Sequence, residues 1–81
     1  MPESRAAENP AVSDAAISSL LGAAIREARQ ARKLSMRALA ASANVSQPFL
    51  STVESGQTMP SLASLYRIAA ALEVSPSHLL P

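Results

Sequence analysis

Apolar residues recur at helical spacing along the chain from about residue 14 onwards. The first stripe, on one face of a helix, consists of Ile17, Leu21, Ala24, Ile25 and Ala28. Ser13 and Asp14 suit its start, because a serine oxygen can accept from a free backbone N–H and an acid favours the positive end of the helix dipole. Gly22 costs about 1 kcal/mol relative to alanine inside a helix, which favours an effective start nearer residue 18 or 19.

Four shorter helices follow the first in this pattern, at about residues 36–43, 46–55, 62–72 and 76–80. Serines at positions 35, 46, 61 and 75 lie at their starts, where serine is favoured as a cap. Asn44 is expected in the turn between the second and third helices, because asparagine accepts left-handed backbone angles. Gly56 is expected to end the third helix. The sequence therefore predicts an all-α fold of five helices.

The third predicted helix has two different faces. Leu50, Val53 and Glu54 project to one side, and Glu54 is the one carboxylate that we expect to be buried. The other side carries small uncharged side chains, namely Gln47, Pro48, Ser51, Thr52 and Ser55. This second face is either an ordinary solvated helix surface or a surface that contacts a partner.

The composition limits the class of protein. The chain has 81 residues, which favours one domain, and 48% of them are hydrophobic although only 2% are aromatic. Residues 1–12 contain two internal prolines and no apolar periodicity, so we expect a disordered N-terminal arm there. No apolar run reaches the roughly 18 residues that span a membrane. We therefore expect a cytoplasmic protein without a membrane partner, whose folded domain is residues 13–81.

Neither a metal site nor a catalytic site is indicated by the sequence. The chain has no cysteine and a single histidine, His78, so a structural zinc site is close to excluded. Gly22 and Gly56 are isolated, and no glycine-rich phosphate loop exists. No nucleophile, base and third group recur in a catalytic pattern. We therefore expect no cofactor and no enzymatic activity.

Positive charge is concentrated in one part of a chain whose formal net charge is only +1. The basic residues between positions 26 and 37 are Arg26, Arg29, Arg32, Lys33 and Arg37, with only Glu27 opposing them. Such a cluster is either a solvated helix face or a source of nonspecific attraction to nucleic acid.

The segment at about residues 35–56 has the geometry that places a helix in the major groove of DNA: a helix, a short turn and a second helix with an exposed polar face. Gln47 can offer a donor and an acceptor to adenine, and Ser51 and Thr52 can bond several bases. The Pro48 ring can meet a thymine methyl group.

Residues from about 21 to 80 resemble the lambda-repressor-like helix-turn-helix family, also called the Cro or xenobiotic-response-element type. The resemblance lies in LGAAIREAR, KLSMRALAASANVSQPFLSTVESG and PSLASLYRIAAALEVSPSHLL. It implies a compact five-helix DNA-binding domain with the third helix as reader. Met36 departs from the family pattern, in which glutamine is common, and so do Asn44 and Pro48.

The resemblance also implies roles for individual residues. Base contacts are implied for Gln47, Pro48, Ser51 and Thr52. Phosphate contacts are implied for Ser46, Ser55, Gln57 and Thr58, and the basic cluster adds expected phosphate contacts of Arg37 and Lys33. Arg29 and Glu54 occupy positions that often form a buried structural ion pair.

The function implied is sequence-specific binding of double-stranded DNA by a transcriptional regulator, a repressor in this interpretation, as a homodimer on a two-fold related site. Such a protein would be associated with the nucleoid in the cytoplasm. A further C-terminal sensing or dimerisation domain, absent from this chain, is also expected. The alternative is an antitoxin or adaptor-type protein-interaction module, which would use a helical face or the acidic arm.

Overall fold

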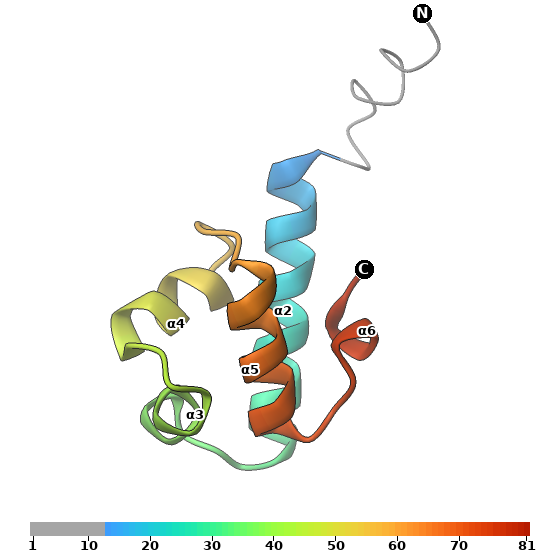
Figure 1. The fold of residues 1–81 in the computed structure, drawn as a ribbon. Helices are drawn as coiled ribbons and strands as arrows, with labels where there is room; N and C mark the ends of the chain where they lie inside the picture. The colour runs from blue at the N-terminus through green and yellow to red at the C-terminus, as the bar shows by residue number, and fades with distance from the viewer. Residues whose placement is uncertain (1–12) are drawn as a thin grey trace, which may run out of the picture.

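The computed structural model describes residues 13–81, and the predicted disordered arm at 1–12 lies outside the described residues. The described part contains five α-helices and no strand, as the sequence predicts (Figure 1). They are α2 (Asp14–Ala31), α3 (Met36–Ala43), α4 (Gln47–Glu54), α5 (Leu62–Leu72) and α6 (Pro76–Leu79). The prediction of an all-α fold of five helices is therefore confirmed.

Serine caps define where the helices begin. The side-chain oxygens of Ser13, Ser35, Ser46 and Ser61 each accept a hydrogen bond from the backbone N–H three residues later, at 3.0–3.1 Å. These are the capping bonds that serine is favoured to make at a helix start. At the other end of α3, Asn44 has the expected left-handed conformation, with φ at 56°.

The start of α2 corrects one expectation. The helix begins at Asp14, capped by Ser13, and continues through Gly22 without interruption. The shift towards residue 18 or 19 inferred from Gly22 is therefore wrong. Propensity is a weak local preference that packing overrides, and Gly22 is buried in the contact of α2 with α4.

Both glycines of the sequence lie at this contact between α2 and α4. A Cβ on Gly22 would come within 2.7 Å of the Glu54 carbonyl oxygen and closer still to that of Val53. Gly56 has φ at +81°, and a Cβ there would lie 3.0 Å from the Cα of Ser19. The backbones of α2 and of the end of α4 therefore approach more closely than any other residue type would allow.

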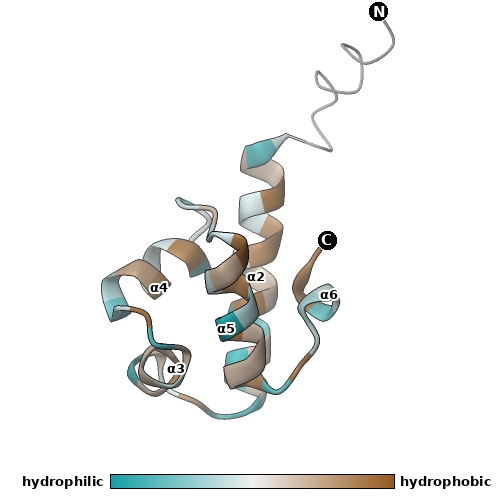
Figure 2. Ribbon diagram, viewed as in Figure 1, coloured by the Kyte–Doolittle hydropathy of each residue, from teal (hydrophilic) through white to brown (hydrophobic). Residues whose placement is uncertain are grey.

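One apolar cluster joins all five helices. Its largest fully buried side chains are Leu21, Ile25, Leu39, Leu50, Ile68, Leu72, Leu79 and Val53. Helix α3 packs against α4 and α5, α2 packs against α4, and α6 closes the opposite side against α2 and α5. Hydrophobic and hydrophilic positions alternate around the helices, as expected for elements that each bury one face (Figure 2).

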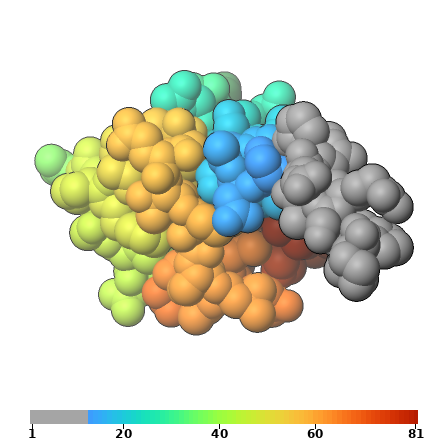
Figure 3. Space-filling model, turned by 90° about the horizontal axis from the view of Figure 1, so that it is seen from above, coloured from blue at the N-terminus to red at the C-terminus, as the bar shows by residue number. Residues whose placement is uncertain are grey.

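The packing leaves α3 and α4 together on one side of the molecule and α6 on the other (Figure 1). Seen from above, α4 and the segment that follows it form one edge of the surface (Figure 3). The C-terminal leucines differ from each other: Leu79 is buried in the core, whereas Leu80 is 49% exposed.

Candidate nucleic-acid interface

Helix α4 is fixed along one face and exposed along the other. Leu50 and Val53 are fully buried, and Glu54 is 5% exposed. On the opposite face, Gln47, Pro48, Ser51 and Ser55 are exposed, and Thr52 is half-buried. The structure thus places the four residues for which base contacts are expected on one continuous surface of a single helix, beginning at its first turn.

The first turn of α4 combines a capping serine with a proline at a position where the helix needs no N–H. Ser46 caps the helix through its bond from the Phe49 N–H, and Pro48 lies within the first two helical positions. A missing N–H has no consequence at such a position, because the first N–H groups of a helix have no partner within it. Pro48 therefore projects its ring from the helix start with no loss of helical hydrogen bonding.

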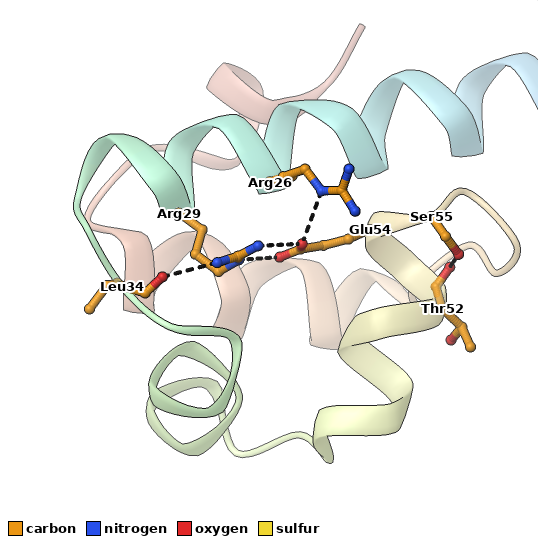
Figure 4. A network of polar contacts seen from close by, with 6 residues as sticks. All are labelled: Arg26, Arg29, Leu34, Thr52, Glu54 and Ser55. Carbon is orange, nitrogen blue, oxygen red and sulfur yellow. Dashed lines mark hydrogen bonds and ion pairs between the residues drawn. The ribbon is translucent and has the colours of Figure 1, made fainter.

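The hydroxyls near the end of α4 bond to the helix itself. Thr52 Oγ1 donates to the Phe49 carbonyl at 2.8 Å, and Ser55 Oγ donates to the Thr52 carbonyl at 3.0 Å. Figure 4 shows Thr52 and Ser55 projecting from the side of α4 away from the arginines of α2. Both hydroxyls therefore already have a partner for their hydrogen.

Glu54 anchors the end of α4 to α2. Arg29 Nε lies 2.7 Å from Glu54 Oε2, and Arg29 Nη2 lies 3.0 Å from Oε1, so that the pair is bidentate (Figure 4). Arg29 Nη1 also donates to the Leu34 carbonyl at 3.0 Å, so the same side chain holds the α2–α3 connection just before α3 begins. The hydrogen bond to Glu54 raises the pKa of Arg29, burial opposes this change, and the charge of Glu54 adds to it.

Arg26 is a second partner of Glu54 that the sequence analysis missed. Its Nε lies 3.6 Å from Glu54 Oε1, with the Arg26 side chain 55% exposed. The spacing of Arg26 and Arg29 contains the signal, because residues three apart share one face of a helix.

Arg67 also has a structural role that the sequence analysis missed. Its Nε donates to the Ala43 carbonyl at 3.2 Å and its Nη2 to Ser64 Oγ at 3.2 Å. The last carbonyls of a helix have no partner within the helix, so Arg67 supplies one at the end of α3, directly before the turn into α4. Nothing in the sequence marks this contact, because a backbone carbonyl carries no residue-specific signal.

The basic cluster between residues 26 and 37 is largely used inside the protein. Arg26 and Arg29 face Glu54, and Arg32 pairs with Glu73 at 2.9 Å. Among the described residues, Lys33 and Arg37 form no ion pair. Both are exposed, Lys33 in the α2–α3 connection and Arg37 in the first turn of α3.

The remaining residues for which phosphate contacts are expected lie at the two ends of α4. Ser46 precedes the helix, and Ser55, Gln57 and Thr58 follow it, all of them exposed. Met36, where the family pattern commonly has glutamine, is partly buried and packs against the core. It therefore supports α3 through apolar contact instead of a polar one.

Residues 13–81 contain no group of three or more metal-binding side chains. His78 is exposed in α6. In the same part of the chain, no helix combines the length and the apolar character that crossing a membrane requires.

The comparisons with known proteins agree with this geometry. The model of the family described as "Helix-turn-helix" matches residues 25–79. The HTH-type transcriptional regulator DdrOP3 of Deinococcus deserti is 39% identical over 56 residues, which are 69% of this chain and 43% of that protein. This chain thus spans less than half the length of the curated relatives that it matches.

Two solved structures have the same fold. The restriction-modification controller protein C.AhdI from Aeromonas hydrophila aligns with a TM-score of 0.76 at 32% identity, over 78% of this chain and 96% of that one. An HTH_3 family transcriptional regulator from Vibrio cholerae aligns with a TM-score of 0.79 at 33% identity, over 83% of this chain and 38% of that one. The resemblance identified in the sequence is confirmed, and the chain belongs to the helix-turn-helix family.

Proposed function

We propose that residues 13–81 form the DNA-binding domain of a transcriptional regulator that binds double-stranded DNA sequence-specifically, with α4 in the major groove. The observation that carries this proposal is the contrast between the two faces of α4. Its inner face is held by Leu50, Val53 and the Glu54 ion pair, whereas its outer face is exposed. A reading helix needs this combination, because its side chains must meet base edges in a fixed register.

Helix α4 fits the width of the major groove, and the side chains on its outer face can contact base edges there. The major groove is about 12 Å wide and admits one helix. Gln47 can make a bidentate contact to adenine, Ser51 and Thr52 can bond base edges, and the Pro48 ring can meet a thymine methyl group. All four residues lie on the outer face of α4.

Phosphate contacts would hold α4 in this position. Ser46, Ser55, Gln57 and Thr58 flank the helix, and Arg37 and Lys33 carry positive charge that no described carboxylate neutralises. Ser46 Oγ accepts a hydrogen bond within the protein, so its own hydrogen is free for a phosphate oxygen. Ser55 can do the same only after its hydroxyl rotates away from the Thr52 carbonyl.

The proposal includes two copies on a two-fold related site, because one domain reads only a few base pairs. The outer face of α5 supports this, since Leu62 and Tyr66 are 69% and 56% exposed. With Ala63 and Arg67 they line a shallow hollow, and the Arg67 guanidinium is already bonded within the protein. This surface could bury apolar area against a second copy. By covering its site on nucleoid DNA in the cytoplasm, the dimer would act as a repressor.

Selection from a random pool of DNA duplexes tests the proposal. We expect an enriched two-fold related site whose half-sites lie about 34 Å apart or a multiple of that distance. Titration of the selected duplex and of a random duplex at several salt concentrations should then give tighter binding to the selected one. Equal affinity for both would contradict specific recognition. No binding even at low salt would favour the protein-interaction alternative.

A further inference from the structure

The hydroxyl of Thr52 is held in one orientation by the helix that carries it. Its oxygen lies 2.8 Å from the Phe49 carbonyl oxygen, and because a carbonyl can only accept, the hydroxyl must donate its hydrogen there. The branched Cβ leaves threonine few rotamers in a helix. In this structure the bond to the Phe49 carbonyl holds the one observed. Thr52 is also half-buried, which limits its movement further.

A hydroxyl has one hydrogen and two acceptor lone pairs. With the hydrogen bonded to Phe49, the oxygen of Thr52 can still accept but can no longer donate. Phosphate oxygens only accept, so this state of Thr52 has nothing to offer the DNA backbone. In the major groove, the donors among base groups are the N6 amino group of adenine and the N4 amino group of cytosine.

We propose that Thr52 is a specificity-determining residue that accepts a hydrogen bond from an adenine or cytosine amino group and disfavours the keto groups of guanine and thymine. The inference rests on the proposed function, since it requires α4 to lie in the major groove. Each base pair presents one amino group and one keto group there. Thr52 therefore reads which strand carries the amino base, and it tolerates exchange of adenine for cytosine on that strand.

Contact with a keto group is the competing possibility. The Thr52 hydroxyl would then have to leave the Phe49 carbonyl and rotate towards the DNA. Giving up one intramolecular hydrogen bond corresponds to about a two- to tenfold loss in affinity. If the hydroxyl does not rotate, the Thr52 oxygen and the keto oxygen of the base face each other as two acceptors, which adds repulsion between their lone pairs.

Two other polar residues of this region serve as comparisons, because their hydrogen-bonding groups differ from those of Thr52. Gln47 carries both a donor and an acceptor and is exposed, so its readout has no such restriction. Ser55 donates to the Thr52 carbonyl, one turn from the base-reading part of α4. Replacing Ser55 by alanine should weaken binding to all duplexes alike, because a phosphate contact carries no sequence information, and should leave the preference for amino bases unchanged.

The test uses the duplex obtained by selection and begins by locating the base pair whose identity matters to Thr52. Binding of the wild type, Thr52→Val and Thr52→Ser is measured for all four base pairs at each position of the half-site. Valine keeps the shape of threonine without the hydroxyl, and serine keeps the hydroxyl. Thermal unfolding of each variant shows that it remains folded, and Ser55→Ala is the matched control.

We expect one position at which the wild type and Thr52→Ser bind adenine and cytosine about five- to thirtyfold more tightly than guanine and thymine. Thr52→Val should bind all four within about threefold. Replacing adenine there by unsubstituted purine, which lacks the amino group, should weaken the wild type to the level of Thr52→Val and leave Thr52→Val unchanged.

Three results would overturn the inference while leaving the proposed function intact. They are a wild-type preference for guanine or thymine at that position, a loss on unsubstituted purine that persists in Thr52→Val, and a selected site in which no position responds to Thr52→Val. If the proposed function itself is wrong, selection enriches no duplex. This outcome differs from the three results above, and it also rules out the proposed role of Thr52.

Discussion

Arg29 and Glu54 join the long helix α2 to the last turn of α4 through two parallel contacts of 2.7 and 3.0 Å. The Glu54 side chain is completely buried and that of Arg29 is 12% exposed. The pair lies on the face of α4 opposite to the one that we propose to contact DNA (Figure 4). It therefore sets the position of the reading helix without taking part in reading.

Replacing Glu54 by glutamine should lower the free energy of unfolding by about 3–5 kcal/mol, because Arg29 would keep its charge in a buried place without a counter-charge. Chemical denaturation measures this. Glu73→Gln is the matched control, since Glu73 is 70% exposed in its pair with Arg32. It should change the free energy of unfolding by no more than about 0.5 kcal/mol. Similar losses in the two variants would contradict a special role for the buried pair.

The raised pKa of Arg29 sets the pH range in which this pair stabilises the fold. A group whose pKa is higher in the folded than in the unfolded state stabilises the fold fully at pH values below its unfolded pKa. That stabilisation is lost as the pH rises through the folded-state pKa. Arg29 should therefore contribute unchanged across neutral pH and lose its contribution only in strong alkali. The unfolding free energies of the wild type and of Arg29→Met/Glu54→Leu, which removes both charges of the pair, should differ by a constant amount between about pH 6 and about pH 8.

Replacing Gly22 by alanine distinguishes packing from helix propensity. Propensity alone predicts stabilisation by about 1 kcal/mol. The added methyl group would instead meet the carbonyl oxygens of Val53 and Glu54, so we expect destabilisation by about 1–3 kcal/mol. Ala23→Gly is the neighbouring control at an exposed position and should cost about 1 kcal/mol. A more stable Gly22→Ala would show that α2 and α4 can separate without loss.

The cap of α4 should contribute measurably to stability. Ser46→Ala removes the bond to the Phe49 N–H and should lower the free energy of unfolding by about 0.5–2 kcal/mol. Ser75 precedes α6 without a side-chain capping bond, so Ser75→Ala should have a much smaller effect. Equal effects in thermal or chemical unfolding would contradict the assignment of the cap.

Two variants separate base reading from phosphate attraction. Gln47→Ala should weaken binding to the selected duplex by about 1–3 kcal/mol and relax the preference at one position. Arg37→Ala should weaken binding to selected and random duplexes alike and reduce the slope of log affinity against log salt by about one. If Gln47→Ala weakened both duplexes equally, Gln47 would contact the DNA backbone and not a base.

The outer face of α5 should control self-association. Leu62→Glu introduces a charge on the exposed apolar surface beside Tyr66, and we expect it to shift sedimentation towards the monomer and to weaken binding to a two-fold related site more than to a single half-site. Leu80→Glu, which places the same charge on the exposed leucine directly after α6, is the comparison. If Leu80→Glu alone abolished association, the dimer would form through the C-terminal end.

The local elements of this protein could be predicted from its sequence alone. Helix periods, serine caps and the turn at Asn44 depend on residues within one or two turns of each other, so the pattern of side chains contains them. The two faces of α4 follow from the same periodicity. The pairing of Arg29 with Glu54 was implied only by the family resemblance, since charge alone does not name a partner 25 residues away.

Only the tertiary structure decided how these elements meet. In the sequence, Gly22 is a residue of low helix propensity within α2. In the structure, the carbonyl oxygens of α4 lie so close to it that a side chain would not fit. In the sequence, the basic cluster is one run of positive charge. In the structure, Arg26, Arg29 and Arg32 each lie close to a carboxylate. Arg67 donates to the Ala43 carbonyl, which lies 24 residues away along the chain and is a group that every residue has. Contacts of this kind join groups that are far apart along the chain, so the local pattern of side chains does not specify them.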